Sequence, residues 1–319
     1  MVDNNDRLIL LLWGNAKQRQ ALFKVLCATG ADVEFDKPNA SFDGRYQLIV
    51  LDYDFIDQTG QELLKELAKQ EKPPPVLVVT SSKDRESFLD LLDNQVLTNL
   101  IAKTDDLSGN ELVVTVQKII KNDVFGLEKY LTWGAEIIEN TITNSCEDKE
   151  TQLNALEHYL DRIGCNRRLI NRARSVADEF IMNAVYNAPA DANGNPKYAS
   201  ISRAEKISLE PNEHVLFRYA CDGRSFVMSV RDNFGRMERA TVLAYLRKCF
   251  SKGIDQIDTK DGGAGLGLYY IFESLNQFII NLSPEYRTEM IGVMDISGSF
   301  RDFAERPKSL NIFLQERNP

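Results

Sequence analysis

The chain has 319 residues, of which 43% are hydrophobic and 27% are charged, and its formal net charge is −9. This length accommodates about two domains of ordinary size, and the composition is that of a soluble globular protein. The acid excess is spread along the chain, so neither half offers an electropositive surface for nucleic acid or for an anionic membrane. We therefore expect no nucleic-acid partner, no membrane partner and a cytoplasmic location.

The apolar runs and the cysteines agree with this expectation. Leu8–Trp13, the longest early apolar run, is too short to cross a bilayer and lacks the flanks of a signal peptide. The five cysteines stand far apart without a CxxC pair, and only two histidines are present. This usage is typical of free thiols in a reducing compartment.

The first part of the chain, residues 1–121, alternates short apolar runs with amphipathic segments. The expected strands are Leu8–Trp13, Asp32–Phe35, Gln47–Asp52, Val76–Thr80 and Leu100–Ala102. The expected helices are Gln18–Thr29, Gln61–Lys69, Arg85–Asp93 and Glu111–Lys121. Buried strands that alternate with helices predict an α/β domain, a doubly wound parallel sheet covered on both faces.

Residues 122–149 follow as a predicted helical connector, because apolar groups recur at helical spacing over Val124–Asn140. Such a stripe fits packing on a domain or a homodimer seam. From residue 150 the order of elements changes. Helices are expected at 151–163, 167–187 and 266–276, and strands near 214–221, 225–231, 278–283, 287–296 and 309–315. Helices grouped against an antiparallel or mixed sheet predict an α+β two-layer domain over 150–319.

Two polar groups of this second domain stand out. Glu179, Asn183 and Asn187 recur every four residues and share one face of a helix. Asp232 ends an apolar strand just before a turn that contains Gly235. A carboxylate at such a place can accept a hydrogen bond from an exocyclic amine such as that of adenine. Alone, each group also fits an ordinary solvated face or turn.

A glycine-rich run, 262–268, leads into an amphipathic helix. Glycines let backbone amides approach phosphate oxygens closely, and a helix N-terminus favours anionic charge. No strand leads into this run, so neither a P-loop nor a Rossmann fingerprint fits. A flexible hinge is the alternative interpretation.

In this order and spacing, the three segments resemble the Bergerat-fold (GHKL) ATPases, the superfamily of gyrase, Hsp90, histidine kinases and MutL. Glu179 and Asn183 match the N-box, and Asp232 matches the Asp-containing box. The second glycine box, G-x-G-L-G-L, is matched by Gly263, Gly265, Leu266, Gly267 and Leu268. The resemblance spans residues 150–319.

The resemblance implies ATP and Mg²⁺ as cofactors. Asn183 would coordinate Mg²⁺ and Glu179 would be the general base. The residues implied to bind the nucleotide are Asn183, Asn187, Asp232, Gly235, Gly263, Gly265, Leu266, Gly267 and Thr288. The stretch 238–262 would be a lid, with Lys252 or Lys260 as candidates to reach a phosphate. The chain departs from the family at Phe234 and Arg236, which occupy the two glycine positions of the Asp box.

The first domain resembles a response-regulator receiver. Asp52 stands in the phosphoacceptor position, Gly60 follows at the family spacing, and the switch positions are Thr80 and Lys103. A receiver also needs an acidic pair after its first strand, where this chain has Trp13, Gly14 and Asn15. We therefore expect a pseudo-receiver that serves as an interaction module, with weak or no phosphorylation. The alternative is a retained switch with Asp54 or Asn15 as substitute ligands.

Neither histidine, His158 or His214, lies in a phosphoacceptor motif, so a classical histidine kinase is not expected. The compact second domain most resembles the anti-sigma-factor serine kinases. The implied function is signal transduction: the domain binds Mg-ATP and regulates a partner, either sigma-factor-like or another signalling protein, with serine/threonine phosphorylation as one option. The alternative is a non-catalytic, nucleotide-gated scaffold.

Overall fold

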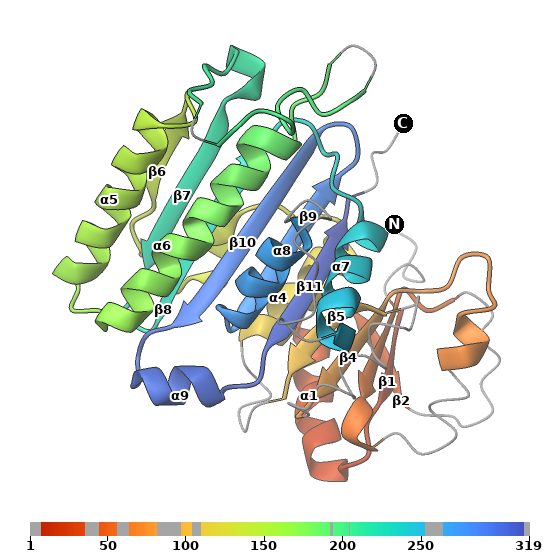
Figure 1. The fold of residues 1–319 in the computed structure, drawn as a ribbon. Coiled ribbons are helices and arrows are strands. Elements are labelled where there is room, and N and C mark those ends of the chain that lie inside the picture. Colours follow the sequence, from red (N-terminus) through yellow and green to blue (C-terminus); the bar gives the residue numbers. More distant parts are fainter. Residues whose placement is uncertain are drawn as a thin grey trace. The chain divides into compact units, whose positions relative to one another are not determined.

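The computed structural model describes residues 8–35, 45–55, 64–81, 97–103, 110–191, 194–203, 205–252 and 264–315. The chain divides into two compact units (Figure 1). Unit 1 comprises Met1–Val124 and Pro307–Phe313, and unit 2 comprises Phe125–Arg306 and Leu314–Pro319. The C-terminal part of the predicted 150–319 domain is thus shared between the units. Among the described residues, no helix has both the length and the apolar character needed to cross a membrane.

Unit 1 is built on a parallel sheet. Its parallel strands are β1 (Leu8–Leu12), β2 (Asp32–Phe35), β3 (Leu48–Asp52), β4 (Val76–Thr80) and β5 (Leu97–Ala102). Their order in space is β2-β1-β3-β4-β5, with every neighbouring pair parallel. This is the flavodoxin-like, doubly wound order, and it puts the carboxyl ends of the strands at one edge of the sheet. The predicted α/β, receiver-like fold of this unit is therefore present.

The central strands are apolar up to their last residues, Asp52 and Thr80, as expected for a sheet covered on both faces. All five residues of β3 and all five of β4 are buried. Helix α1 (Ala16–Ala28) begins two residues before the predicted start, because the side chain of Asn15 accepts hydrogen bonds from the first-turn amides. Helix α4 (Asn110–Lys121) forms as predicted. The predicted helix 85–93 and the start of 61–69 lie outside the described residues.

A strand from the far end of the chain completes the unit 1 sheet. β11 (Ser309–Leu314) pairs antiparallel with β5, with Asn311 opposite Asn99. Asn99 Nδ2 donates to Asn311 Oδ1 at 3.1 Å, and Asn311 Nδ2 donates to Glu111 Oε1 at 3.2 Å. The hydroxyl of Ser309 accepts the amide of Ala102 at 2.9 Å. These polar contacts fix the register of β11 inside the unit.

Unit 2 places helices on an antiparallel sheet. Its strands are β6 (Ile138–Ile142), β7 (Val215–Cys221), β8 (Ser225–Asp232), β9 (Gln277–Ser283) and β10 (Arg287–Asp295), in the order β9-β10-β8-β7-β6. Its helices are α5 (Glu147–Arg162), α6 (Arg167–Met182), α7 (Arg239–Lys252), α8 (Ala264–Glu273) and α9 (Phe300–Glu305). Figure 1 shows α5, α6 and α8 over one face of this sheet. The rings of Phe180 on α6 and Phe278 on β9 stack 5.9 Å apart, which joins the two layers.

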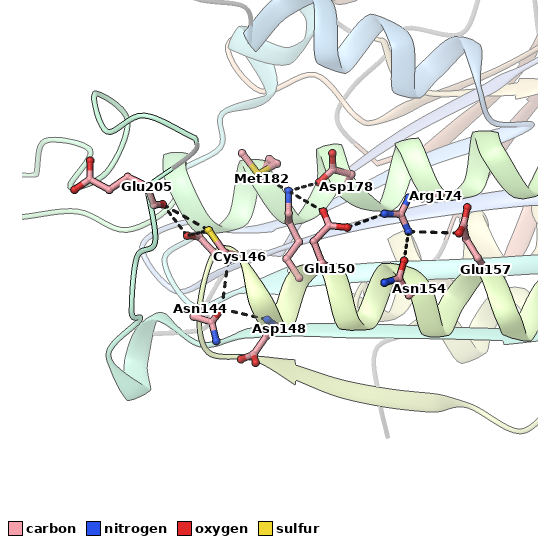
Figure 2. Close-up of polar contacts among 12 residues, drawn as sticks. Asn144, Cys146, Asp148, Glu150, Asn154, Glu157, Arg174, Asp178, Met182 and Glu205 are labelled. Carbon is pink, nitrogen blue, oxygen red and sulfur yellow. Dashed lines mark hydrogen bonds and ion pairs between the residues drawn. The ribbon is translucent and has the colours of Figure 1, made fainter.

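Polar contacts on the outer side fix how α6 lies beside α5 (Figure 2). The guanidinium of Arg174 is 2.7 Å from Glu150 and 3.0 Å from Asn154. Lys149 Nζ lies 2.8 Å from Asp178 Oδ1, one residue before Glu179. Pairs this exposed contribute below about 1 kcal/mol each, so the apolar contacts supply most of the stability. The ion pairs set the position of α6 along its neighbour.

The helical connector predicted for 122–149 is wrong. Gly126 and Gly134 have φ of 108° and 93°, which a right-handed helix does not permit. Between them stands a single 3₁₀ turn, Leu127–Tyr130, and Ile138–Ile142 is strand β6, paired with β7. The apolar groups that suggested a helix therefore serve a turn and an edge strand.

Candidate functional site

The end of α6 carries the three polar residues predicted on one helix face. The α-helix stops at Met182, and Asn183–Asn187 continue as one π-helical turn. The Asn183 side-chain amide donates to the backbone oxygen of Glu179 at 2.9 Å, and Asn187 Nδ2 donates to Asn183 Oδ1 at 2.9 Å. The structure thus joins Glu179, Asn183 and Asn187 in one chain of contacts. Single π-helical turns inside helices occur frequently at functional sites.

The first turns of α8 lie directly against Glu179. A Cβ built on Gly267 would overlap Oε1 of Glu179 and stand 2.6 Å from its Cδ, so the glycine lets the Glu179 carboxyl lie against the helix backbone. Gly265 and Leu266 belong to the same helix start, and Gly263 lies outside the described residues. Two of the predicted segments, distant in sequence, therefore meet at a helix N-terminus, where anionic groups are favoured.

Asp232 and Thr288 are opposite each other in the β8–β10 pair. Asp232 is 7% exposed, and its Oδ1 accepts hydrogen bonds from the amides of Phe234 at 2.8 Å and Gly235 at 3.1 Å. Burial raises the pKa of Asp232, and hydrogen bonds from those amides and from Thr288 oppose the shift. The side chain of Thr288 is itself buried, so the two polar groups lie together at the end of the sheet.

Gly235 serves the shape of the turn after Asp232. Its φ is 60°, and a Cβ there would stand 2.7 Å from the amide nitrogen of Tyr286 and 2.8 Å from that of Arg287. The turn between β9 and β10 therefore packs onto its backbone. Phe234 and Arg236 flank this glycine, and Gly235 alone meets the close approach.

The carboxyl of Glu179 is half-buried. Burial, the largest cause, raises the pKa of Glu179, and the negative charge of Asp178 raises it further. The positive charge of Arg203 and the hydrogen bond from Asn183 lower it. A carboxyl whose pKa is raised toward neutral pH is a stronger base than an exposed one, as general-base work requires. Arg203 belongs to no motif, so sequence reasoning did not place it near Glu179.

The predicted lid, 238–262, is described only in its first part. Residues 239–252 form α7, which packs on α8, with Phe250 edge-on to Phe272 at 5.7 Å. Lys260 and the side chain of Lys252 lie outside the described residues. Neither lysine is therefore placed relative to the site.

In unit 1 the predicted receiver residues converge at the carboxyl ends of β3, β4 and β5. Lys103 Nζ lies 2.7 Å from Asp52 Oδ1 and 3.3 Å from Asp54 Oδ2. The hydroxyl of Thr80 donates to Asp54 Oδ1 at 2.7 Å. Asp52 is 3% exposed whereas Asp54 lies at the surface, so in this crevice one lysine pairs with a buried and an exposed carboxylate.

The residues present do not fit the magnesium site of a receiver. Asn15, one candidate for a substitute ligand, uses its side-chain oxygen to cap α1. Asp54, the other candidate, has a lowered pKa: burial opposes the shift, while hydrogen bonds from Thr80 and Ser81 and the charge of Lys103 cause it. The ring of Trp13 stands where an acid belongs, 5.1 Å from Lys103 Nζ. Asp52 Oδ1, both carboxylate oxygens of Asp54 and the side-chain oxygen of Asn15 thus already have protein partners, which leaves few oxygens for Mg²⁺.

No family model matches the chain, and no curated protein matches it in sequence. Three solved structures are similar to parts of it. A response regulator from Burkholderia multivorans is 28% identical with a TM-score of 0.28, covering 34% of this chain and 94% of its own. A chain of the SiaB–SiaC complex from Pseudomonas aeruginosa is 14% identical with a TM-score of 0.32, and the match covers 49% of this chain and 88% of that one. The regulatory domain of the master biofilm regulator CsgD is 12% identical with a TM-score of 0.30, and the match covers 39% of this chain and 96% of that one. With TM-scores this low, the receiver-like assignment of unit 1 rests on its strand order.

Proposed function

We propose that unit 2 binds Mg-ATP and that the chain is a signal-transduction protein that uses this binding to regulate a partner protein. The observation that carries the proposal is the contact between Gly267 and Glu179, which closes the start of α8 onto the acid-bearing helix. It supports an anion at the helix N-terminus beside a base. Unit 1 would act as an interaction module, because its crevice is paired internally.

In this proposal the described residues have the following roles toward the nucleotide. Asp232 and Thr288 would hold the adenine, since one offers a buried carboxylate and the other a buried hydroxyl directly beside it. Asn183 would hold Mg²⁺ through its amide oxygen, which Asn187 now contacts. Mg-ATP supplies a transferable phosphoryl group when bound. Glu179 would accept the proton of a water or of a partner's serine or threonine hydroxyl.

A titration of the whole chain with ATP and Mg²⁺, followed by calorimetry, tests the nucleotide site. Asp232→Asn keeps Oδ1 for the amides of Phe234 and Gly235 but replaces the other oxygen with a donor, which an adenine amine cannot meet. We expect binding at least about tenfold weaker, with unchanged unfolding. Asp222→Asn is the matched control, because Asp222 also caps a turn through backbone amides. A wild-type chain that does not bind millimolar ATP contradicts the proposal.

Partner regulation is tested by purifying the chain from its native source with and without ATP. An ATP-dependent partner is expected, and partner phosphorylation that is lost in Glu179→Gln would identify a kinase. The non-catalytic scaffold is the second candidate, favoured by the altered turn at Phe234, Gly235 and Arg236. It predicts ATP binding with no ATP consumed over hours, so measurable Glu179-dependent turnover excludes it.

A further inference from the structure

We propose that Arg203 is a phosphate-binding residue of this site and holds the terminal phosphates of Mg-ATP. The inference rests on the proposed function, and it assigns a phosphate contact to a residue that belongs to none of the motifs of the chain. Arg203 lies in the segment 194–203, between the helix that carries Glu179 and the strand β7.

The position of the Arg203 guanidinium is set by an aromatic contact. Its Cζ lies 5.6 Å from the centroid of the Tyr186 ring. Tyr186 is 2% exposed and belongs to the π-helical turn that also carries Asn183 and Asn187. A buried ring is a rigid platform, so the guanidinium is held over the turn that would bind Mg²⁺.

The charge of Arg203 also acts on Glu179, the acid of the proposed site. Apart from burial, Arg203 has the largest influence on the pKa of Glu179, and it lowers that pKa. The cation is therefore close to the carboxyl that Gly267 touches. Glu179, a bound polyphosphate and the helix N-terminus would meet in one place, and Arg203 supplies positive side-chain charge there.

The donors of Arg203 are available to a ligand. Within the described residues, its interactions are the ring contact with Tyr186 and the electrostatic effect on Glu179; it has no hydrogen bond and no carboxylate within ion-pair distance. Two arginines of the same unit, by contrast, are paired with carboxylates: Arg174 with Glu150 and Arg218 with Glu289. Arg203 itself is exposed. A guanidinium offers a fork of N–H donors that matches phosphate oxygens in pairs.

The test compares the affinities of the whole chain for ATP, ADP and AMP, with Mg²⁺ present, across variants at Arg203. We expect Arg203→Ala to weaken ATP binding by about tenfold or more and AMP binding by less than about twofold, because AMP lacks the terminal phosphates. Arg203→Lys should fall between, since lysine keeps the charge and loses the fork. Arg301→Ala is the control, because Arg301 is an exposed arginine paired only with Glu305 in its own helix.

The outcomes are distinguishable. A loss confined to nucleotides with terminal phosphates supports the inference. An equal loss for ATP, ADP and AMP would mean that Arg203 only supports Tyr186, and unchanged affinities would mean that it makes no contact; either result overturns it. If the wild-type chain binds none of the three nucleotides, the proposed function fails, and the inference fails with it.

Discussion

The two units both carry carboxylates at the ends of buried strands, yet these carboxylates differ in what surrounds them. In unit 1, Asp52 and Asp54 both pair with Lys103, and the hydroxyl of Thr80 donates a hydrogen bond to Asp54. In unit 2, Asp232 has no cation among the described residues as an ion-pair partner. The first cluster sets two carboxylates against one ammonium, whereas in the second Asp232 is held by backbone amides without a cation.

The difference shows that a carboxylate at a strand end does not by itself identify a binding site. What matters is whether other groups of the protein already pair with that carboxylate. The ion pairs of unit 1 contribute to stability because removing Lys103 would leave the buried carboxylate of Asp52 without its cation. A site with unpaired polar groups costs stability, and proteins keep such sites where a ligand offsets the cost. Four experiments test this contrast, from the largest expected effect to the smallest.

Lys103→Met should have the largest effect. Removing the ammonium leaves two carboxylates, whose side chains are 4% and 25% exposed, without their cation. We expect the free energy of unfolding to fall by about 3 to 5 kcal/mol at neutral pH, measured with urea. The double variant Lys103→Met/Asp52→Asn should recover part of this loss. A loss below about 1 kcal/mol would show that the crevice is not internally paired.

The pH dependence of stability should reveal Glu111, which contacts β11. Burial raises the pKa of Glu111 from 4.5 to about 7, against the opposing hydrogen bonds of Ser309 and Asn311. The folded state then keeps the proton at pH values where the unfolded state releases it. Stability is full below pH 4.5 and falls by about 3 kcal/mol as pH rises to about 7. Urea titrations across this range should lose the slope in Glu111→Gln and keep it in Glu305→Gln.

Gly235→Ala should destabilise unit 2 by about 2 kcal/mol or more. The added Cβ meets backbone atoms of the β9–β10 turn, and φ is positive. Gly223→Ala is the matched control: its φ is 90° but a Cβ there meets nothing within 4 Å, so about 1 kcal/mol is expected. Thermal unfolding of both variants measures the difference. Equal losses would show that the turn after Asp232 is not fixed by packing.

The smallest effect is expected from acetyl phosphate with Mg²⁺. Because the oxygens near Asp52 are occupied by Lys103 and by the other contacts of the crevice, no labelling should be seen by intact mass. Stoichiometric labelling that disappears in Asp52→Asn would restore the phosphoryl switch and remove the contrast between the units.

Local patterns were sufficient for most elements. The five strands of the parallel sheet and helix α6 follow from apolar runs and helical spacing, and Asp52, Thr80 and Lys103 could be placed together because parallel strands end at one edge. Helix α9 went unpredicted, and the connector was misread, because spacing does not report the positive φ of Gly126 and Gly134.

Contacts between distant residues could not be read from the sequence. The approach of Gly267 to Glu179 was implied only by a resemblance, and Arg203 over Tyr186 had no pattern at all. The side-chain partners of Asp54 and Asn15 decide whether the crevice can hold a metal ion, and those partners depend on packing. Strand β11 was expected, but not its membership of the first unit.

That membership has a consequence for the order in which the molecule is made. Synthesis proceeds from the N-terminus, so β5 and α4 leave the ribosome well before β11. Until β11 arrives, Asn99 and Glu111 lack Asn311 and Ser309, and one edge of β5 has no strand beside it. An unpaired edge is a template for wrong pairing. Unit 1 therefore reaches its final sheet only after all of residues 125–306 have been synthesised, although it comes first in the sequence.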